Sequence, residues 1–121
     1  NRRGEDPEAC VAATPHAHGH LFVRAADLDL ARREHPLGEG EAPLVTAAMG
    51  AELLVLDDLG HERDFAASWD VLAARYDRAA PTIVTSGWPL AKLAERYGAA
   101  AVRRITESGA HKGAVVEVWD A

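Results

Sequence analysis

The chain has 121 residues, 48% of them hydrophobic and 26% charged, which is the size and balance of at most one globular domain. Its formal net charge of -6 argues against a surface that holds nucleic acid by bulk electrostatics alone, although a local basic patch is compatible with it. A single cysteine, Cys10, excludes an internal disulfide, and no apolar run approaches the roughly 18 residues of a membrane-spanning helix. We therefore expect a cytoplasmic protein without a membrane segment.

Residues 1–18 are polar and mixed, and proline and glycine interrupt any long element, so we expect a linker or the remnant of a helix there. His16, His18 and His20 alternate across the end of this segment. In an extended chain the three imidazoles would share one face, where they could bind Zn²⁺ or Ni²⁺. No neighbouring cysteine or acid completes such a ligand set, so a solvated loop is the favoured interpretation.

Residues 19–121 are expected to form the folded domain, because strand-like and helix-like patterns alternate along them. Apolar runs predict strands at 19–25, 53–56, 81–86 and 114–119. Helical spacing predicts helices at 27–34, 65–76, 90–97 and 99–105, and a short helical turn at 44–49. We expect Asp64 to cap the second helix and Gly98 to end the third. Three aromatic residues on the stripe of the second helix are expected in the core: Phe65, Trp69 and Tyr76.

The stretch Leu53–Gly60 (LLVLDDLG) is the most informative in the chain, because four apolar residues run directly into two adjacent carboxylates. Such a run is typical of a strand buried in a parallel sheet, and ligands of open α/β sheets bind at the carboxyl ends of the strands. Paired carboxylates there need a counterion, and Mg²⁺ with a nucleotide phosphate is the usual one. The stretch therefore predicts a Walker B element, although the chain contains no G-x-x-x-x-G-K-[ST] phosphate loop.

Three motifs follow one another in a fixed order: LLVLDDLG, then TIVTSGWPLAKLAERYG about 25 residues later, then AVRRI at 101–105. In this order the chain resembles, over residues 19–119, the AAA+ ATPases of the DnaC-type helicase loader and IstB-type transposition helper group. The resemblance implies a three-layer, parallel-sheet P-loop NTPase core (AAA+/RecA-like) with strand order 5-1-4-3-2. The strands predicted here would be numbers 2 to 5, so the first strand and its phosphate loop are missing from the centre of the sheet. An open central slot leaves backbone groups unpaired, so we expect residues 19–121 to be the C-terminal part of a longer AAA+ domain.

The resemblance implies a role for each residue of the two strand-end motifs. Asp57 would bind Mg²⁺, through water, and Asp58 would polarise the attacking water. Thr85, Ser86 and Gly87 would occupy the sensor-1 position, with Thr85 next to the nucleotide. The group usually has asparagine where this chain has Gly87, so either Ser86 substitutes for it or the sensor is lost.

Arg104 matches the arginine that, in this group, reaches into the ATP site of a neighbouring subunit. The complete protein would then be a homo-oligomer that hydrolyses ATP with Mg²⁺ to change its grip on a replicative helicase, a transposase or single-stranded DNA. The alternative is a non-catalytic interaction module that keeps the fold and has lost ATP turnover. Gly87 favours this alternative, and the intact pair Asp57–Asp58 opposes it.

Simpler interpretations of the same residues remain open. The two aspartates could be a solvated junction between strand and loop, and Arg103 and Arg104 could be a solvated helix face. Trp88, beside Pro89 in a loop, is expected to be either an exposed contact residue or a cap on the end of the sheet.

Overall fold

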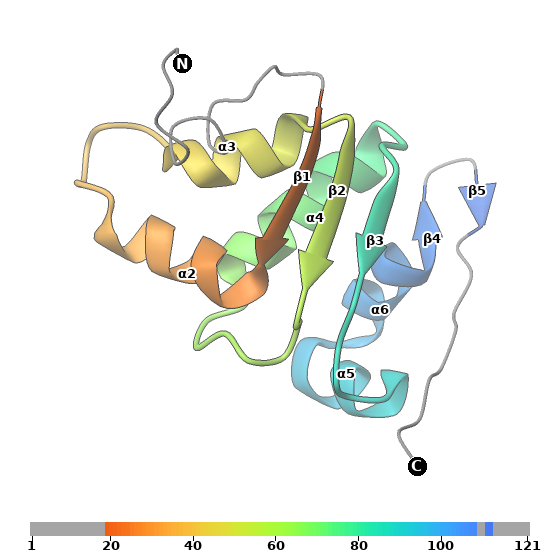
Figure 1. The fold of residues 1–121 in the computed structure, drawn as a ribbon. Coiled ribbons are helices and arrows are strands. Elements are labelled where there is room, and N and C mark those ends of the chain that lie inside the picture. Colours follow the sequence, from red (N-terminus) through yellow and green to blue (C-terminus); the bar gives the residue numbers. More distant parts are fainter. Residues whose placement is uncertain (1–18, 109–110, 113–121) are drawn as a thin grey trace.

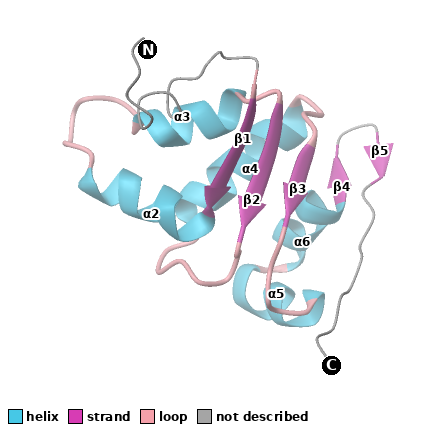
Figure 2. Ribbon diagram, in the orientation of Figure 1, coloured by secondary structure: helices cyan, strands magenta, loops and turns pink. Residues whose placement is uncertain are grey.

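A computed structural model describes residues 19–108 and 111–112 of the chain. These residues form five helices, a three-stranded parallel sheet and a small two-stranded antiparallel sheet, as Figures 1 and 2 show. The predicted α/β class with a parallel sheet is therefore confirmed. The predicted linker with His16 and His18, and the predicted strand at 114–119, lie outside the described residues. His20 is described and exposed at the start of the first strand.

The parallel sheet consists of β1 (His20–Arg24), β2 (Leu53–Asp57) and β3 (Thr82–Val84), in the order β1-β2-β3. The central strand β2 therefore pairs on both sides, and both pairings are parallel. All three strands lie where the apolar runs predict them, although β3 is shorter than its run. The small sheet pairs β4 (Glu107–Ser108) with β5 (His111–Lys112), and the sequence patterns did not predict it.

The helices lie where the sequence predicts them: α2 (Ala25–Glu34), α3 (Pro43–Gly50), α4 (Ala66–Asp77), α5 (Leu90–Tyr97) and α6 (Ala99–Thr106). The N-cap of α4 is Phe65 rather than the predicted Asp64, although the Asp64 carboxylate accepts a hydrogen bond of 2.9 Å from the amide of Ala66, the first residue of the helix. Gly98 ends α5 with a φ of +95°, a conformation that favours glycine, and its amide donates to the Ala94 carbonyl.

One face of the sheet packs on α2, α3 and α4, which lie behind the strands in Figure 1. This face contains the buried residues of β1 and β2, which alternate along each strand as a half-covered sheet requires. The helices contribute aliphatic side chains to the same core. Its main members are Leu21, Val23, Leu28, Val45, Leu54, Leu56, Val71 and Leu72.

The opposite face of the sheet is open. Phe22 of β1, Val55 of β2 and Ile83 of β3 are in register and form one apolar row across this face. Phe22 is 62% exposed and Ile83 is 51% exposed, so no helix of the described part covers the row. Parallel sheets are normally covered on both faces. The described residues thus provide two of the three layers that the resemblance implies.

The aromatic stripe of α4 is less buried than expected. The helix turns its small and aliphatic residues towards the core, whereas Phe65, Trp69 and Tyr76 are only half-buried. Phe65 stacks on Tyr97 of α5, with 3.8 Å between the ring centroids. Close packing on a sheet favours small side chains, so these rings instead fill the space between α4 and the two C-terminal helices.

Arg75 of α4 is a buried cation that the sequence did not predict. The residue is 1% exposed, and its guanidinium donates to the carbonyls of Ala48, Ala51 and Pro81 and to the Thr82 hydroxyl, at 2.6–3.0 Å. Burial lowers the pKa of this group to about 10. The side chain thereby joins the end of α3 to the segments that lead into β2 and β3.

Candidate functional site

The two adjacent carboxylates lie at the carboxyl end of the central strand. Asp57 is the last residue of β2 and is half-buried, and Asp58 follows it with an exposed side chain. Thr85, just beyond β3, donates from its hydroxyl to Asp57 Oδ1 at 2.5 Å. The Thr85 hydroxyl oxygen in turn accepts a hydrogen bond of 3.0 Å from the Asp58 amide. Parallel pairing of β2 and β3 thus brings together three predicted site residues that are 27 and 28 positions apart in sequence.

Asp58 adopts a left-handed backbone conformation, with a φ of +57°. Aspartate tolerates this region better than most residues, but it is uncommon outside glycine. The neighbouring hydrogen bonds fix it, because the Asp58 amide is bound to Thr85 and the Leu59 amide donates to the Thr85 carbonyl at 2.9 Å. Backbone conformations of this kind that the surroundings hold in place are typical of functional sites.

Ser86 uses its hydroxyl to hold the loop after β3. The hydroxyl donates to the Leu59 carbonyl at 2.6 Å and accepts the Trp88 amide at 3.0 Å. Gly87, next to it, is exposed, and a Cβ added there would meet nothing within 4 Å. The structure therefore places Ser86 beside the carboxylate pair, with its proton engaged within the loop. Its role as a sensor stays a prediction.

Arg104 lies apart from the carboxylate pair, on α6 and against α4. Its guanidinium carbon is 5.0 Å from the Trp69 ring centroid and 5.2 Å from the Tyr76 centroid, which is the geometry of a cation–π contact with each ring. With Thr82 and Val84 of β3 it lines a narrow hollow of about 20 Å³. The side chain is half-buried in this position. Its action on a neighbouring subunit stays a prediction.

Glu62 is a site residue that the sequence did not predict. The residue is 2% exposed, and its carboxylate accepts hydrogen bonds from the Gly60 amide at 2.8 Å and the Tyr97 hydroxyl at 2.7 Å. Burial, together with this acceptor, raises the pKa of Tyr97 above its usual range. The ring of Trp88, in the loop after β3, also lies against Gly60. These contacts fasten the loop after Asp58 to α5.

The donor set at the carboxylate pair has the chemistry that Mg²⁺ prefers. Two carboxylates and a hydroxyl are hard oxygen ligands, and Mg²⁺ in nucleotide sites takes one or two carboxylates and completes its shell with water and phosphate. The residues therefore fit this ion. Within residues 19–108 and 111–112, no three His, Cys, Asp or Glu side chains gather as a metal-binding group. The chain also contains no phosphate loop to hold a nucleotide.

Comparisons of the chain with protein-family models, with curated proteins and with solved structures give no match. The resemblance to the DnaC and IstB group therefore rests on the three motifs alone. No helix among the described residues is long and apolar enough to cross a membrane.

Proposed function

We propose that this chain is the carboxylate-bearing part of an ATP-binding and ATP-hydrolysing AAA+ protein of the DnaC/IstB type. The observation that carries the proposal is the Thr85 hydroxyl bound to Asp57 at the adjoining ends of β2 and β3. In the group that the chain resembles, the Walker B acid and the sensor-1 residue lie at the ends of neighbouring strands. The order β1-β2-β3 also agrees with the positions of strands 2, 3 and 4 in that group. The complete protein would act in DNA replication or transposition, with a replicative helicase or a transposase as its partner.

One edge of β3 pairs with no strand among the described residues, and this agrees with a further strand that carries the phosphate loop. The Leu54 amide donates to the Pro81 carbonyl, and the Thr85 amide donates to the Leu56 carbonyl. Since alternate residues of a strand face opposite neighbours, the backbone groups of Thr82 and Val84 point away from β2. No strand in the described residues pairs with them. A parallel strand at this edge would bring the loop that follows it next to Asp57.

Each of the predicted site residues would have a separate role in ATP hydrolysis. Mg²⁺, when bound, neutralises charge on the phosphates and on the leaving group. Asp57 would hold the ion's inner water shell, and Thr85 keeps the Asp57 carboxylate in one orientation through its hydrogen bond. Asp58, exposed at the rim, would accept a hydrogen bond from the attacking water and orient it. Arg104 would serve the site of the next subunit in a homo-oligomer.

The second candidate function is a non-catalytic interaction module with the same fold. Two observations favour it: Gly87 has no side chain to read a phosphate, and the Ser86 proton is engaged with Leu59. Such a module would keep the carboxylate pair only as a strand-to-loop junction.

Nucleotide titration tests whether the phosphate loop comes from outside these 121 residues. The 121-residue chain is expected to bind ATP with Mg²⁺ very weakly, because most phosphate contacts in such sites come from the amides and lysine of the loop. The polypeptide that includes the further strand and its loop is expected to bind tightly. Tight, Mg²⁺-dependent binding by the 121 residues alone would contradict the proposal that the loop comes from elsewhere.

A further inference from the structure

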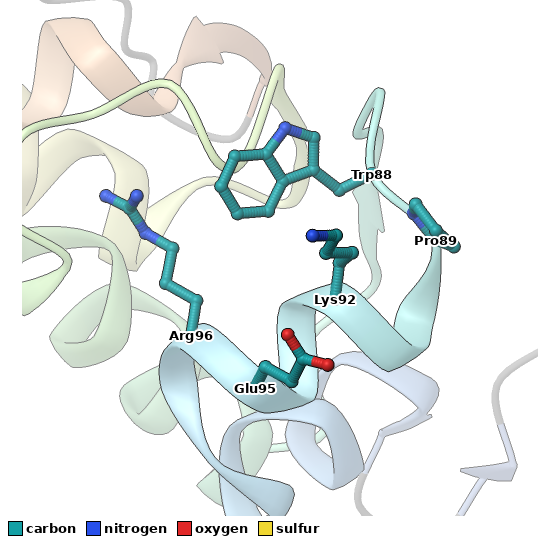
Figure 3. A pocket seen from close by; sticks show the side chains of 5 residues that line it. All are labelled: Trp88, Pro89, Lys92, Glu95 and Arg96. Atoms are coloured by element: carbon teal, nitrogen blue, oxygen red, sulfur yellow. The ribbon is translucent and has the colours of Figure 1, made fainter.

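A hollow of about 540 Å³ lies between the loop after β3 and helix α5. In Figure 3 the Trp88 ring forms one side of this hollow, and the Lys92 and Arg96 side chains extend from α5 on the other. Pro89 and Glu95 complete the lining. None of these residues has a role in the proposed ATP hydrolysis, so the hollow needs an explanation of its own.

The aromatic side of the hollow is held in place by contacts within the chain. The Trp88 ring lies so close to Gly60 that a Cβ added to this glycine would be 3.3 Å from the ring. The Trp88 amide donates to the Ser86 hydroxyl at 3.0 Å. Arg96 donates to the Glu62 carbonyl at 2.6 Å and places its guanidinium carbon 5.4 Å from the Trp88 centroid. A ring and a cation that are already held in position lose little conformational entropy when a ligand binds.

The charged groups around the hollow differ in sign and in what they contact. Arg96 donates to a backbone carbonyl, and Glu95 adds a carboxylate to the lining. Lys92 is exposed, and no ion pair in the described part of the chain involves it. The surrounding residues 86–106 contain four Lys or Arg and one acid, a net charge of +3, whereas residues 19–85 contain six Lys or Arg and twelve acids, a net charge of -6. The hollow therefore offers one exposed ammonium group, in a local positive field, to an incoming carboxylate.

We infer that this hollow binds a short acidic peptide of a partner protein, with an aromatic or proline ring of the peptide packed on Trp88 and an adjacent carboxylate paired with Lys92. Tryptophan and arginine are the side chains that most often dominate binding at protein interfaces, and Trp88 and Arg96 are already in position here. The ring gives the peptide apolar contact area, and the ammonium group selects an acid next to that contact. The inference goes beyond the proposed ATPase and holds whether or not the chain hydrolyses ATP.

The lining favours a peptide over a nucleic acid strand. A strand brings a phosphate with every nucleotide, and its binding needs a groove of cations that follows the backbone. Glu95 lies on the same lining as Lys92, where it would repel a phosphate but accept a hydrogen bond from a peptide amide. The acidic remainder of the chain also repels a long polyanion, whereas it tolerates a peptide with one or two carboxylates.

Selection of a phage-displayed library of random dodecapeptides on the 121-residue chain tests the inference. EDTA is present and nucleotide is absent, so the result does not depend on whether the protein binds or hydrolyses ATP. We expect the selected peptides to share an acid within two positions of an aromatic residue or proline. Fluorescence anisotropy of the most enriched peptide then gives its Kd for each variant. Trp88→Ala should weaken binding about 30-fold or more, as loss of a central interface tryptophan does, and Lys92→Glu about tenfold or more.

Arg103→Glu is the matched control, because it reverses one exposed positive charge on α6 that does not line the hollow. It should weaken peptide binding less than about threefold, since exposed charges outside a contact contribute little. If Trp88→Ala does not fold, as circular dichroism would show, the comparison of Lys92→Glu with Arg103→Glu decides. The inference is wrong if no peptide is enriched, if the enriched peptides lack acids, or if these two charge reversals weaken binding equally. It is also wrong if oligo-dT displaces the peptide at equal concentration, or if the chain is a dimer that Trp88→Ala dissociates, because the hollow would then bind a nucleic acid strand or a second copy.

Discussion

Replacing Thr85 by valine is expected to release the carboxylate pair from the end of β3. Valine keeps the shape of threonine but removes the hydroxyl that donates to Asp57 at 2.5 Å and accepts the Asp58 amide at 3.0 Å. A hydrogen bond to a charged group contributes about 1.5–3 kcal/mol and a neutral one about 0.5–1.5 kcal/mol. In the variant, water can take the place of part of both hydrogen bonds, because Asp57 is half-buried and Asp58 is exposed. We therefore expect the free energy of unfolding to fall by about 2 kcal/mol.

Urea unfolding followed by tryptophan fluorescence measures this change. A loss of about 2 kcal/mol lowers the urea midpoint by about 1–2 M for a protein of this size. Thr85→Ser is the matched control, since serine keeps the hydroxyl and loses only a methyl group, and it should cost less than half as much. If Thr85→Val unfolds at the parental midpoint, or if serine costs as much as valine, then the hydroxyl does not hold the pair.

Three further substitutions test other parts of the account. Arg75→Ala leaves the buried carbonyls of Ala48 and Ala51 without this donor and removes a second donor from the Pro81 carbonyl, so it should cost about 3 kcal/mol or more in urea unfolding. Arg78→Ala, an exposed neighbour with one bond to a carbonyl, should cost less than about 1 kcal/mol, and equal losses would refute a structural role for the buried cation. Gly87→Asn should fold normally, because the position is open, and should raise ATP turnover of the complete protein if this is the sensor-1 position; unchanged turnover would speak against that assignment. Arg104→Ala should leave ATP binding intact and reduce assembly-stimulated hydrolysis by about 10³-fold or more. Mixing it with Asp57→Ala should restore part of the activity, and no recovery in assemblies confirmed by light scattering would count against a shared site.

Local patterns in the sequence were sufficient to predict the three strands of the parallel sheet and the five helices, but not the small sheet of β4 and β5. The place of Thr85 at the end of the strand beside Asp57 was implied by the resemblance. Hydrophobic runs fix where β2 and β3 lie, and the parallel pairing of neighbouring strands brings their carboxyl ends together. The assignment of Gly98 to the end of α5 succeeded for a similar reason, since capping depends on residues within one turn, and the predicted start of α4 was wrong by one residue, because its N-cap is Phe65.

The contacts of charged residues in the interior could not be predicted in this way. Arg75 and Glu62 are of types that are almost always exposed, and their partners come from distant segments of the chain. The burial of the aromatic residues of α4 was overestimated, because large side chains outweigh small ones in any hydrophobic pattern, whereas Leu72 of the same stripe is buried in the core. Close packing on the sheet nevertheless favours Ala67 and Ser68.

Steady-state ATP hydrolysis by the complete protein, with variants of the carboxylate pair, tests the central claim most directly. Asp57→Ala should abolish Mg²⁺-dependent hydrolysis, because it removes the group that holds the ion. Asp58→Asn should slow turnover and leave nucleotide binding largely unchanged, because it removes only the charge that orients water. Asp77→Asn, an exposed aspartate at the end of α4, should hydrolyse ATP at the parental rate. Parental rates in both Asp57→Ala and Asp58→Asn would show that the pair is structural and that the non-catalytic module is the correct description.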